Sequence, residues 1–303
     1  MDKSLKLLQL AACAGEPTAQ YLLGLRTQDG IGLDKDIGNS VALYQRAADA
    51  GLAAAQNKLA KCYGTGDGVD KNISRACELF QLAADAGDSS AQTSLGSCYR
   101  SGHGVPVDPS MAFLWYEKAA SNGNYDAQNN LGECYQYGIG VSKDVGRAIE
   151  LYQKALHGGN AKAKYNLALC FERGKGVDKD IIKAEILYRE AAEAGILNAQ
   201  TCIGRFYYNG ITLTKDMLKA AEYYKQAAAA GDVEAQFLLG ICYEHGNGVE
   251  KNIAQAATYY QCAADAGDSR AQKRLGELPK NPRRHGKKTK VTTIGAGFRN
   301  PRG

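Results

Sequence analysis

Apolar residues recur along the chain at helical spacing. In the segment after Gly51 they stand at Ala55, Leu59, Cys62 and Tyr63, and this i, i+4, i+7, i+8 spacing places the four side chains on one face of a helix. Residues that can cap a helix N-terminus stand at the corresponding starts of other segments, at Asp88, Asn124, Asp232 and Asp268. The pattern therefore predicts an amphipathic helix in each segment.

A second helix is predicted after each first one. In one copy its apolar stripe includes Ala148, Leu151 and Tyr152. Good N-cap residues precede this helix in successive copies, at Asp36, Asn72, Asp108, Asp144, Asp180, Asp216 and Asn252. Between the two helices stand paired glycines such as Gly138 and Gly140, which allow the positive φ that a tight turn needs.

The two-helix unit repeats with a fixed period of 36 residues. Glycines mark the period without one insertion or deletion, at Gly15, Gly51, Gly87, Gly123, Gly159, Gly195, Gly231 and Gly267. A fixed period between roughly 20 and 50 residues is the signature of a solenoid. Since each unit contributes two helices, the sequence predicts an all-α fold, an α-solenoid of antiparallel helix pairs.

The period divides the chain into a solenoid domain, residues 1–278, and a tail, residues 279–303. Within the solenoid we expect a half repeat at 1–15, seven full repeats over 16–267 and a truncated repeat at 268–278. The composition, 45% hydrophobic and 23% charged residues, is that of a globular protein. The tail has no helical periodicity and little to bury, so we expect it to be disordered.

The shared motif is clear in residues 192–231, which read AEAGILNAQTCIGRFYYNGITLTKDMLKAAEYYKQAAAAG. Across the copies it is A-x-A-G, then A-Q-x-x-L-G-x-C-Y, G-x-G-V, K-D and A-x-x-L-Y-x-x-A-A. This pattern resembles the Sel-one-like repeat, a relative of the tetratricopeptide repeat, over about residues 3–278. The resemblance implies that the solenoid is a right-handed superhelix.

The resemblance also implies a class of function. Repeat proteins of this kind include regulators of fungal chitin synthase, subunits of the endoplasmic-reticulum degradation machinery, and bacterial signalling or virulence proteins. We therefore expect a non-enzymatic scaffold that binds a peptide or protein segment in a concave groove and regulates a larger enzyme or signalling complex such as chitin synthase. The alternative is a secreted bacterial protein of the cysteine-rich group, to which penicillin-binding or β-lactamase activity is ascribed.

Cysteine usage separates these alternatives. Five of the nine cysteines occupy one repeat position, namely Cys62, Cys98, Cys134, Cys170 and Cys242. Equivalent positions on stacked helices lie roughly 8–10 Å apart, whereas a disulfide needs Cα atoms within about 7 Å. We therefore expect buried, reduced thiols that pack as small apolar groups, and hence a cytoplasmic protein.

Candidate catalytic and metal-binding sets are missing from the sequence. The four histidines, His103, His157, His245 and His285, lie in separate repeats or in the tail, and none has partner ligands at zinc-site spacing. The Gly-x-Gly turns follow helices rather than strands, unlike phosphate-binding loops. We expect no enzyme activity, no metal, no cofactor and no small-molecule substrate.

Binding is expected on the face of the first helices that varies from copy to copy. In tetratricopeptide-like solenoids the first helices line the concave surface, so this face should form the groove. Amides, arginines and exposed tyrosines can hydrogen-bond an extended peptide, capture carboxylates and supply apolar anchors. The predicted groove residues are Asn129, Asn130, Glu133, Gln136, Tyr137, Tyr165, Asn166, Arg205, Tyr208 and Asn209. A merely solvated helix face is the alternative interpretation.

Positive charge is concentrated in the tail. Residues 278–303 hold eight of the 37 Lys and Arg and no acid, which leaves 29 basic against 32 acidic residues elsewhere. The basic cluster is Arg283, Arg284, Lys287, Lys288 and Lys290. Such a cluster suits an anionic surface or a nuclear import receptor, so a nuclear location is the alternative to a cytoplasmic one. A solubilising end without a partner is the other interpretation.

Overall fold

The computed structural model describes residues 3–279, which form sixteen α-helices and no strand. The helices are α1 (Lys3–Cys13), α2 (Pro17–Asp29), α3 (Ile37–Asp49), α4 (Ala53–Thr65), α5 (Ile73–Asp85), α6 (Ser89–Ser101), α7 (Pro109–Ser121), α8 (Tyr125–Tyr137), α9 (Val145–His157), α10 (Ala161–Arg173), α11 (Ile181–Glu193), α12 (Leu197–Asn209), α13 (Met217–Ala229), α14 (Val233–His245), α15 (Ile253–Asp265) and α16 (Ser269–Glu277).

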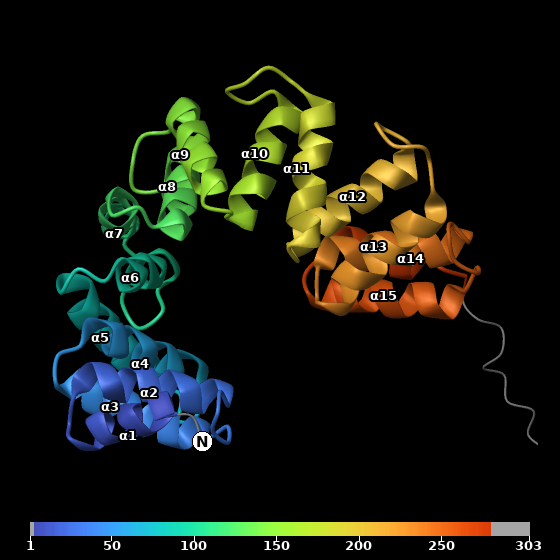
Figure 1. The fold of residues 1–303 in the computed structure, drawn as a ribbon. Coiled ribbons are helices and arrows are strands. Elements are labelled where there is room, and N and C mark those ends of the chain that lie inside the picture. The colour runs from blue at the N-terminus through green and yellow to red at the C-terminus, as the bar shows by residue number, and fades with distance from the viewer. Residues whose placement is uncertain (1–2, 280–303) are drawn as a thin grey trace, which may run out of the picture. The chain divides into compact units, whose positions relative to one another are not determined.

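Two kinds of helix alternate along the chain. We call the even-numbered helices A helices and the odd-numbered helices B helices. The chain divides into two compact units, residues 1–216 with α1 to α12 and residues 217–303 with α13 to α16. Within each unit an A helix packs against the B helix that follows it, and that B helix packs against the next A helix (Figure 1). The predicted α-solenoid of antiparallel helix pairs is confirmed.

The predicted N-caps stand at the helix starts. Asp36 accepts a 2.9 Å hydrogen bond from the backbone N–H of Asn39 at the start of α3, and Asn124 accepts one of 2.9 Å from Ala127 at the start of α8. The same role falls to Asn72, Asp88, Asp108, Asp144, Asp180, Asp232, Asn252 and Asp268. Each cap satisfies a backbone N–H that has no partner inside its helix.

Glycine ends each A helix from α2 to α14, with φ between 63° and 88°. This left-handed conformation suits a residue without a side chain, and the predicted turns are confirmed. The second glycine of the turn has another task, close packing against the previous repeat. A Cβ on Gly140 would overlap the carbonyl oxygen of Pro109. Thr212 replaces this glycine in one repeat and adopts no positive φ.

A buried tyrosine on the B helix forms the centre of most repeats. Its side chain is 0–1% exposed in Tyr44, Tyr116, Tyr152, Tyr188, Tyr224 and Tyr260. The A helix facing it often has a glycine at the contact: a Cβ would stand 2.7 Å from the Tyr116 ring on Gly96, and 2.6 Å from the Tyr152 ring on Gly132. Close helix approach therefore explains a glycine that costs about 1 kcal/mol of helix propensity.

A glutamine near the start of most A helices ties that helix to the end of the preceding B helix. Gln92, for example, donates from Nε2 to the carbonyl oxygen of Ala84 at 3.1 Å. In α10 Lys164 takes the place of glutamine and pairs with Glu190 of α11, Nζ to Oε2 at 2.7 Å. The glutamine contacts hold the turn from B helix to A helix and satisfy a carbonyl at the helix end.

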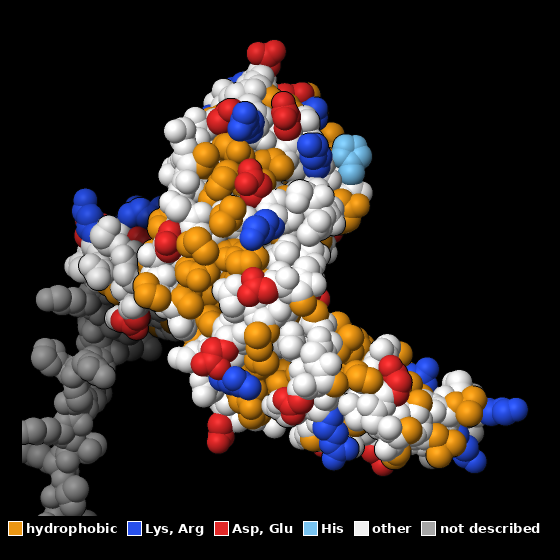
Figure 2. All heavy atoms as spheres, turned by 90° about the vertical axis from the view of Figure 1, so that its left-hand side faces the viewer, with side chains coloured by type: hydrophobic (Ala, Val, Ile, Leu, Met, Phe, Trp, Pro, Cys, Tyr) orange, Lys and Arg blue, Asp and Glu red, His pale blue; other side chains and the backbone are white. Residues whose placement is uncertain are grey.

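The molecular surface carries charges of both signs. On the face drawn in Figure 2, Lys and Arg side chains lie among Asp and Glu side chains, with apolar side chains showing between them. This face therefore lacks the single-sign field that steers a strongly charged partner.

Candidate functional site

The ten predicted groove residues all lie on A helices α8, α10 and α12 of the first unit. We call the surface of these residues the A-helix face. Asn129, Gln136 and Asn166 are buried, whereas Tyr137 and Asn209 are exposed. The remaining five are half-buried: Asn130, Glu133, Tyr165, Arg205 and Tyr208. Burial thus divides the set into residues that face neighbouring helices and residues that solvent reaches.

Glu133 is the centre of a hydrogen-bond network across three A helices. Its Oε2 accepts from Arg100 of α6 at 2.6 Å, and its Oε1 accepts from Asn129 and from Asn166 of α10, both at 3.3 Å. Asn166 also donates to Asn129 at 2.9 Å. Because a half-buried carboxylate here receives three donors, its charge is compensated within the protein.

A second ion pair joins α10 to α12, and the order of its acidic and basic residues along the chain is reversed. Arg205 of α12 donates to Glu172 of α10 at 2.8 Å, and the hydroxyl of Tyr188 donates to the same carboxylate at 2.6 Å. In the first pair the arginine belongs to the earlier helix, and here the glutamate does. Both pairs connect residues 33 positions apart, so they fix the register of one repeat against the next.

Gln136 is engaged by the central tyrosine of its own repeat. Tyr152 donates its hydroxyl to Gln136 Oε1 at 2.7 Å, and burial raises the pKa of Tyr152 well above its ordinary value. The tyrosine–polar pairs of this kind are Tyr44–Gln28, Tyr152–Gln136, Tyr188–Glu172 and Tyr260–Glu244, each 16 residues apart. The polar residue is therefore a structural partner of the buried hydroxyl.

Tyr137 is the largest solvent-exposed group of the A-helix face. Its side chain is 58% exposed at the last residue of α8. Asn130 accepts a 3.4 Å bond from Asn129, and within residues 3–279 its side-chain amide N–H groups donate to no other group. Tyr165, by contrast, packs on Tyr188 with ring centroids 5.8 Å apart.

The structure joins four of the predicted residues, Asn129, Asn130, Glu133 and Asn166, in one hydrogen-bond network, and it places Arg205 in a separate ion pair. Arg100 and Glu172 complete the ion pairs of the A-helix face, although neither is among the ten. A signal for both was present in the sequence, since residues of opposite charge stand 33 positions apart on consecutive A helices. The prediction that the ten residues bind a partner stays a prediction.

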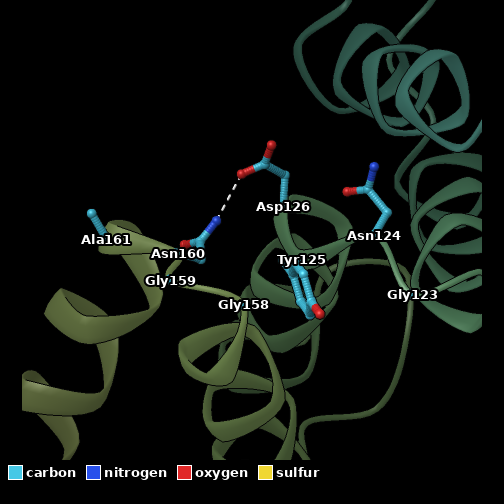
Figure 3. A pocket seen from close by; sticks show the side chains of 8 residues that line it. All are labelled: Gly123, Asn124, Tyr125, Asp126, Gly158, Gly159, Asn160 and Ala161. Carbon is cyan, nitrogen blue, oxygen red and sulfur yellow. Dashed lines mark hydrogen bonds between the residues drawn. The ribbon is translucent and has the colours of Figure 1, made fainter.

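A polar pocket of about 440 Å³ lies where two turns meet, and it was not predicted. It is lined by residues 123–126 and 158–161 (Figure 3). Asn160 donates to Asp126 at 2.7 Å across it, and the half-exposed ring of Tyr125 lies on Gly158. The signal in the sequence is Gly158, because the equivalent residue in most other copies is alanine.

The other predicted features of the chain are its reduced cysteines, the lack of a metal site and the basic tail. All nine cysteines lie in the described range and none forms a disulfide. Of the five at the shared position, Cys62, Cys134, Cys170 and Cys242 are buried as predicted, and Cys98 is half-buried. Within residues 3–279 no three His, Cys, Asp or Glu side chains are grouped to hold a metal ion. The five basic tail residues, 283–290, lie outside the described residues.

A helix that crosses a bilayer needs about 20 consecutive, mostly apolar residues. Among the described residues, every helix is too short or too polar to cross a membrane.

Comparison with known families identifies the repeat. The family model described as Sel1 repeat matches eight segments of the chain: 1–16, 17–52, 53–88, 89–124, 126–160, 161–196, 198–232 and 233–268. No curated protein is matched by the full chain.

Two solved structures share both fold and sequence with the chain. One is c5321, a protective antigen of uropathogenic Escherichia coli strains with an SLR fold, with 36% identity and a TM-score of 0.63. The match covers 90% of this chain and 59% of that protein, so this chain spans less than two thirds of the antigen's length. The other is a Sel1 repeat protein from Oxalobacter formigenes, with 31% identity, a TM-score of 0.66, and coverage of 92% of this chain and 80% of that protein.

Proposed function

This chain belongs to the Sel1 repeat family, and on that premise we propose that it is a non-catalytic scaffold that holds a segment of a partner protein on its A-helix face. Sel1 repeat solenoids are in general protein-interaction scaffolds, and this chain carries the repeat over most of its length. The partner stays undefined, since nothing in the described residues singles out chitin synthase or another enzyme.

The proposal rests on the exposure of Tyr137, whose side chain is 58% exposed. An exposed aromatic ring is an effective anchor when the residues beneath it are already ordered, because little conformational entropy is then lost on binding. The network around Glu133 orders α6, α8 and α10 without a partner. Tyr137 and Asn130 therefore present an apolar ring and an amide from a rigid support.

The buried amides have a different part in this proposal. The side chains of these amides form hydrogen bonds with residues of their own and neighbouring repeats, and the amides are Asn129, Gln136 and Asn166. They support the binding surface by setting the spacing of the A helices, while solvent, and hence a partner, reaches Tyr137, Asn130 and Asn209.

We also propose a cytoplasmic location. Cysteines without disulfides suit a reducing compartment, which supports a cytoplasmic scaffold over a secreted cysteine-rich protein. We expect the purified scaffold to leave a chromogenic cephalosporin unhydrolysed, whereas a β-lactamase would hydrolyse it.

The test compares two exposed tyrosines of one helix. Partners captured by the wild-type chain from its source cells are identified by mass spectrometry, and capture is repeated with Y137A and with Y125A. Tyr125, 49% exposed at the opposite end of α8, is the matched control. We expect Y137A to lose a partner that Y125A retains, with both variants melting as folded proteins. Equal capture by the two variants contradicts the proposed surface.

A further inference from the structure

The second repeat breaks the tyrosine–polar pairing at both positions. Phe80 stands in α5 where most repeats have the central tyrosine, and Gly64 stands in α4 where the hydrogen-bond acceptor belongs. Loss of the acceptor alone would leave a buried hydroxyl without a partner, at a cost of about 1–3 kcal/mol. Because phenylalanine has no hydroxyl, the two changes together leave no unsatisfied polar group.

The double change is accompanied by a pocket of about 330 Å³ on α4, α5 and α6. Gly64 and Phe80 both line it, and the nearest atom to a Cβ on Gly64 would be Ala76 Cβ at 4.0 Å, so this wall is open. Phe80 is 8% exposed, whereas the six central tyrosines are 0–1% exposed. The volume is within the range of small-molecule sites, about 300–1,000 Å³.

The floor of the pocket is apolar. It consists of the buried side chains of Ala76, Cys77 and Phe80, with Cys98 of α6 beside Cys77. The Cys77 thiol donates to the carbonyl oxygen of His103 at 2.9 Å. Burial and the neighbouring Cys77 thiol raise the pKa of Cys98 to about 12, so this thiol remains neutral at pH 7 and packs as an apolar group.

The rim of the pocket carries one ammonium group, that of Lys71. Lys71 and His103 line the pocket and both are exposed. The Lys71 ammonium forms no ion pair with any residue of the described range. Lysine recurs at this repeat position, in Lys35, Lys143, Lys179, Lys215 and Lys251. The open space beside Lys71, and not the lysine itself, distinguishes the second repeat.

We propose that this pocket binds a compact apolar carboxylate, with its hydrocarbon part against Phe80 and its carboxylate at Lys71. An apolar floor of this size fits one ring or a short branched chain, and a single unpaired cation at the mouth selects an anionic head group. This binding site goes beyond the scaffold role and is independent of Tyr137. The ligand is held there without any chemical step.

The probe for the test is 4-phenylbutyrate, with the uncharged 4-phenylbutyramide as its partner. Affinity for the full chain is measured by isothermal titration calorimetry. We expect saturable binding of the carboxylate with a Kd of about 1 mM or tighter, as suits a ligand of about twelve heavy atoms. K71Q is expected to weaken the carboxylate about threefold and leave the amide unchanged, since an exposed ion pair contributes about 0.2–1 kcal/mol.

The fourth repeat supplies the matched control. G64Q with F80Y installs the pair that Gln136 and Tyr152 form there, so the variant is expected to fold and to lose binding of both probes. The reciprocal change, Q136G with Y152F, copies the second repeat into the fourth and is expected to add a second site. Circular dichroism melting curves establish that each variant is folded.

Three outcomes overturn the proposal. They are no saturable binding to the wild-type chain, equal binding to the G64Q/F80Y variant, and equal loss of carboxylate and amide affinity in K71Q. Y137A is measured in parallel and is expected to bind 4-phenylbutyrate like the wild type, which keeps failure of this site distinct from failure of the protein-binding surface.

Discussion

The ring of Tyr125 lies on the backbone of Gly158, so closely that a Cβ at residue 158 would overlap the ring. The φ of Gly158 is −84°, a value open to any residue, so the backbone does not require glycine here. Glycine is required by its neighbour, and the two residues form a matched pair between the first residue of α8 and the turn before α10.

G158A tests this pair. The added methyl group is expected to displace the ring and destabilise the first unit by about 1–3 kcal/mol, as overpacking does. The measurement is the midpoint of urea unfolding, monitored by circular dichroism. Y125A combined with G158A is expected to recover most of the loss, because alanine occupies the position of Gly158 in most other copies. An undiminished loss in the double variant rules out the ring as its cause.

E133A removes the centre of the A-helix network. Arg100, Asn129 and Asn166 then lose their shared acceptor, and we expect destabilisation of about 1–3 kcal/mol, the cost of buried donors left unpaired. Urea unfolding measures the effect. E117A is the control, since Glu117 is exposed on α7 and a substitution there should stay within about 0.5 kcal/mol. Equal effects of the two substitutions would show that the network adds nothing to stability.

Alkaline pH is expected to destabilise the protein through its central tyrosines. Burial raises the pKa of Tyr152 and of Tyr188 above the ordinary value, so the folded state keeps their hydroxyls protonated while the unfolded state ionises near pH 10. Stability from these groups is complete below about pH 10 and is lost as the pH rises beyond it.

The corresponding measurement is urea unfolding between about pH 8 and 12, a range that spans the ordinary tyrosine pKa, and the wild-type midpoint should fall with rising pH. Y152F and Y188F together remove two of the groups that cause this fall. The variant is less stable at the low end of the range, since two hydroxyl bonds are lost, and its midpoint should depend less steeply on pH. A slope equal to that of the wild type would exclude these tyrosines as a cause.

Thiol titration distinguishes a reduced scaffold from a cysteine-rich secreted protein. All nine cysteines should react with a chromogenic disulfide reagent after denaturation without reductant. In the folded protein Cys13 and Cys262 should react first because they are exposed. Cys134 and Cys242 should react slowly, since burial raises the pKa of each thiol to about 11 and lowers the thiolate fraction. A shortfall of thiols in the denatured protein would contradict the reduced state.

Much of the fold was predictable because its signals are local and repeated. Capping residues such as Asp144, the turn glycine Gly138 and the buried Tyr152 each act within a few residues of the helix they shape. Eight copies of the same signal make the register unambiguous. The burial of the shared cysteines follows from the same register.

The candidate site was predictable only in part. The sequence indicates which residues differ among copies, and the structure places those ten on the A helices of one unit. Whether an amide such as Asn166 faces solvent or the next repeat depends on the side chain that the neighbouring copy presents to it, here Asn129 and Glu133. Hydrophobic periodicity cannot distinguish these two positions, because the surroundings of the amide are polar in both.

The sequence by itself determined the repeat, its helices, their caps and turns, and the buried tyrosines, since short-range sterics and periodic burial dictate all of these. Only the tertiary structure decided how unlike copies meet. It showed that Glu133 joins three helices, that Tyr125 rests on Gly158, and that Gly64 with Phe80 accompanies a pocket. The physical reason is that each feature depends on the shapes and charges of residues up to 37 positions apart, which pack together only after the helices stack.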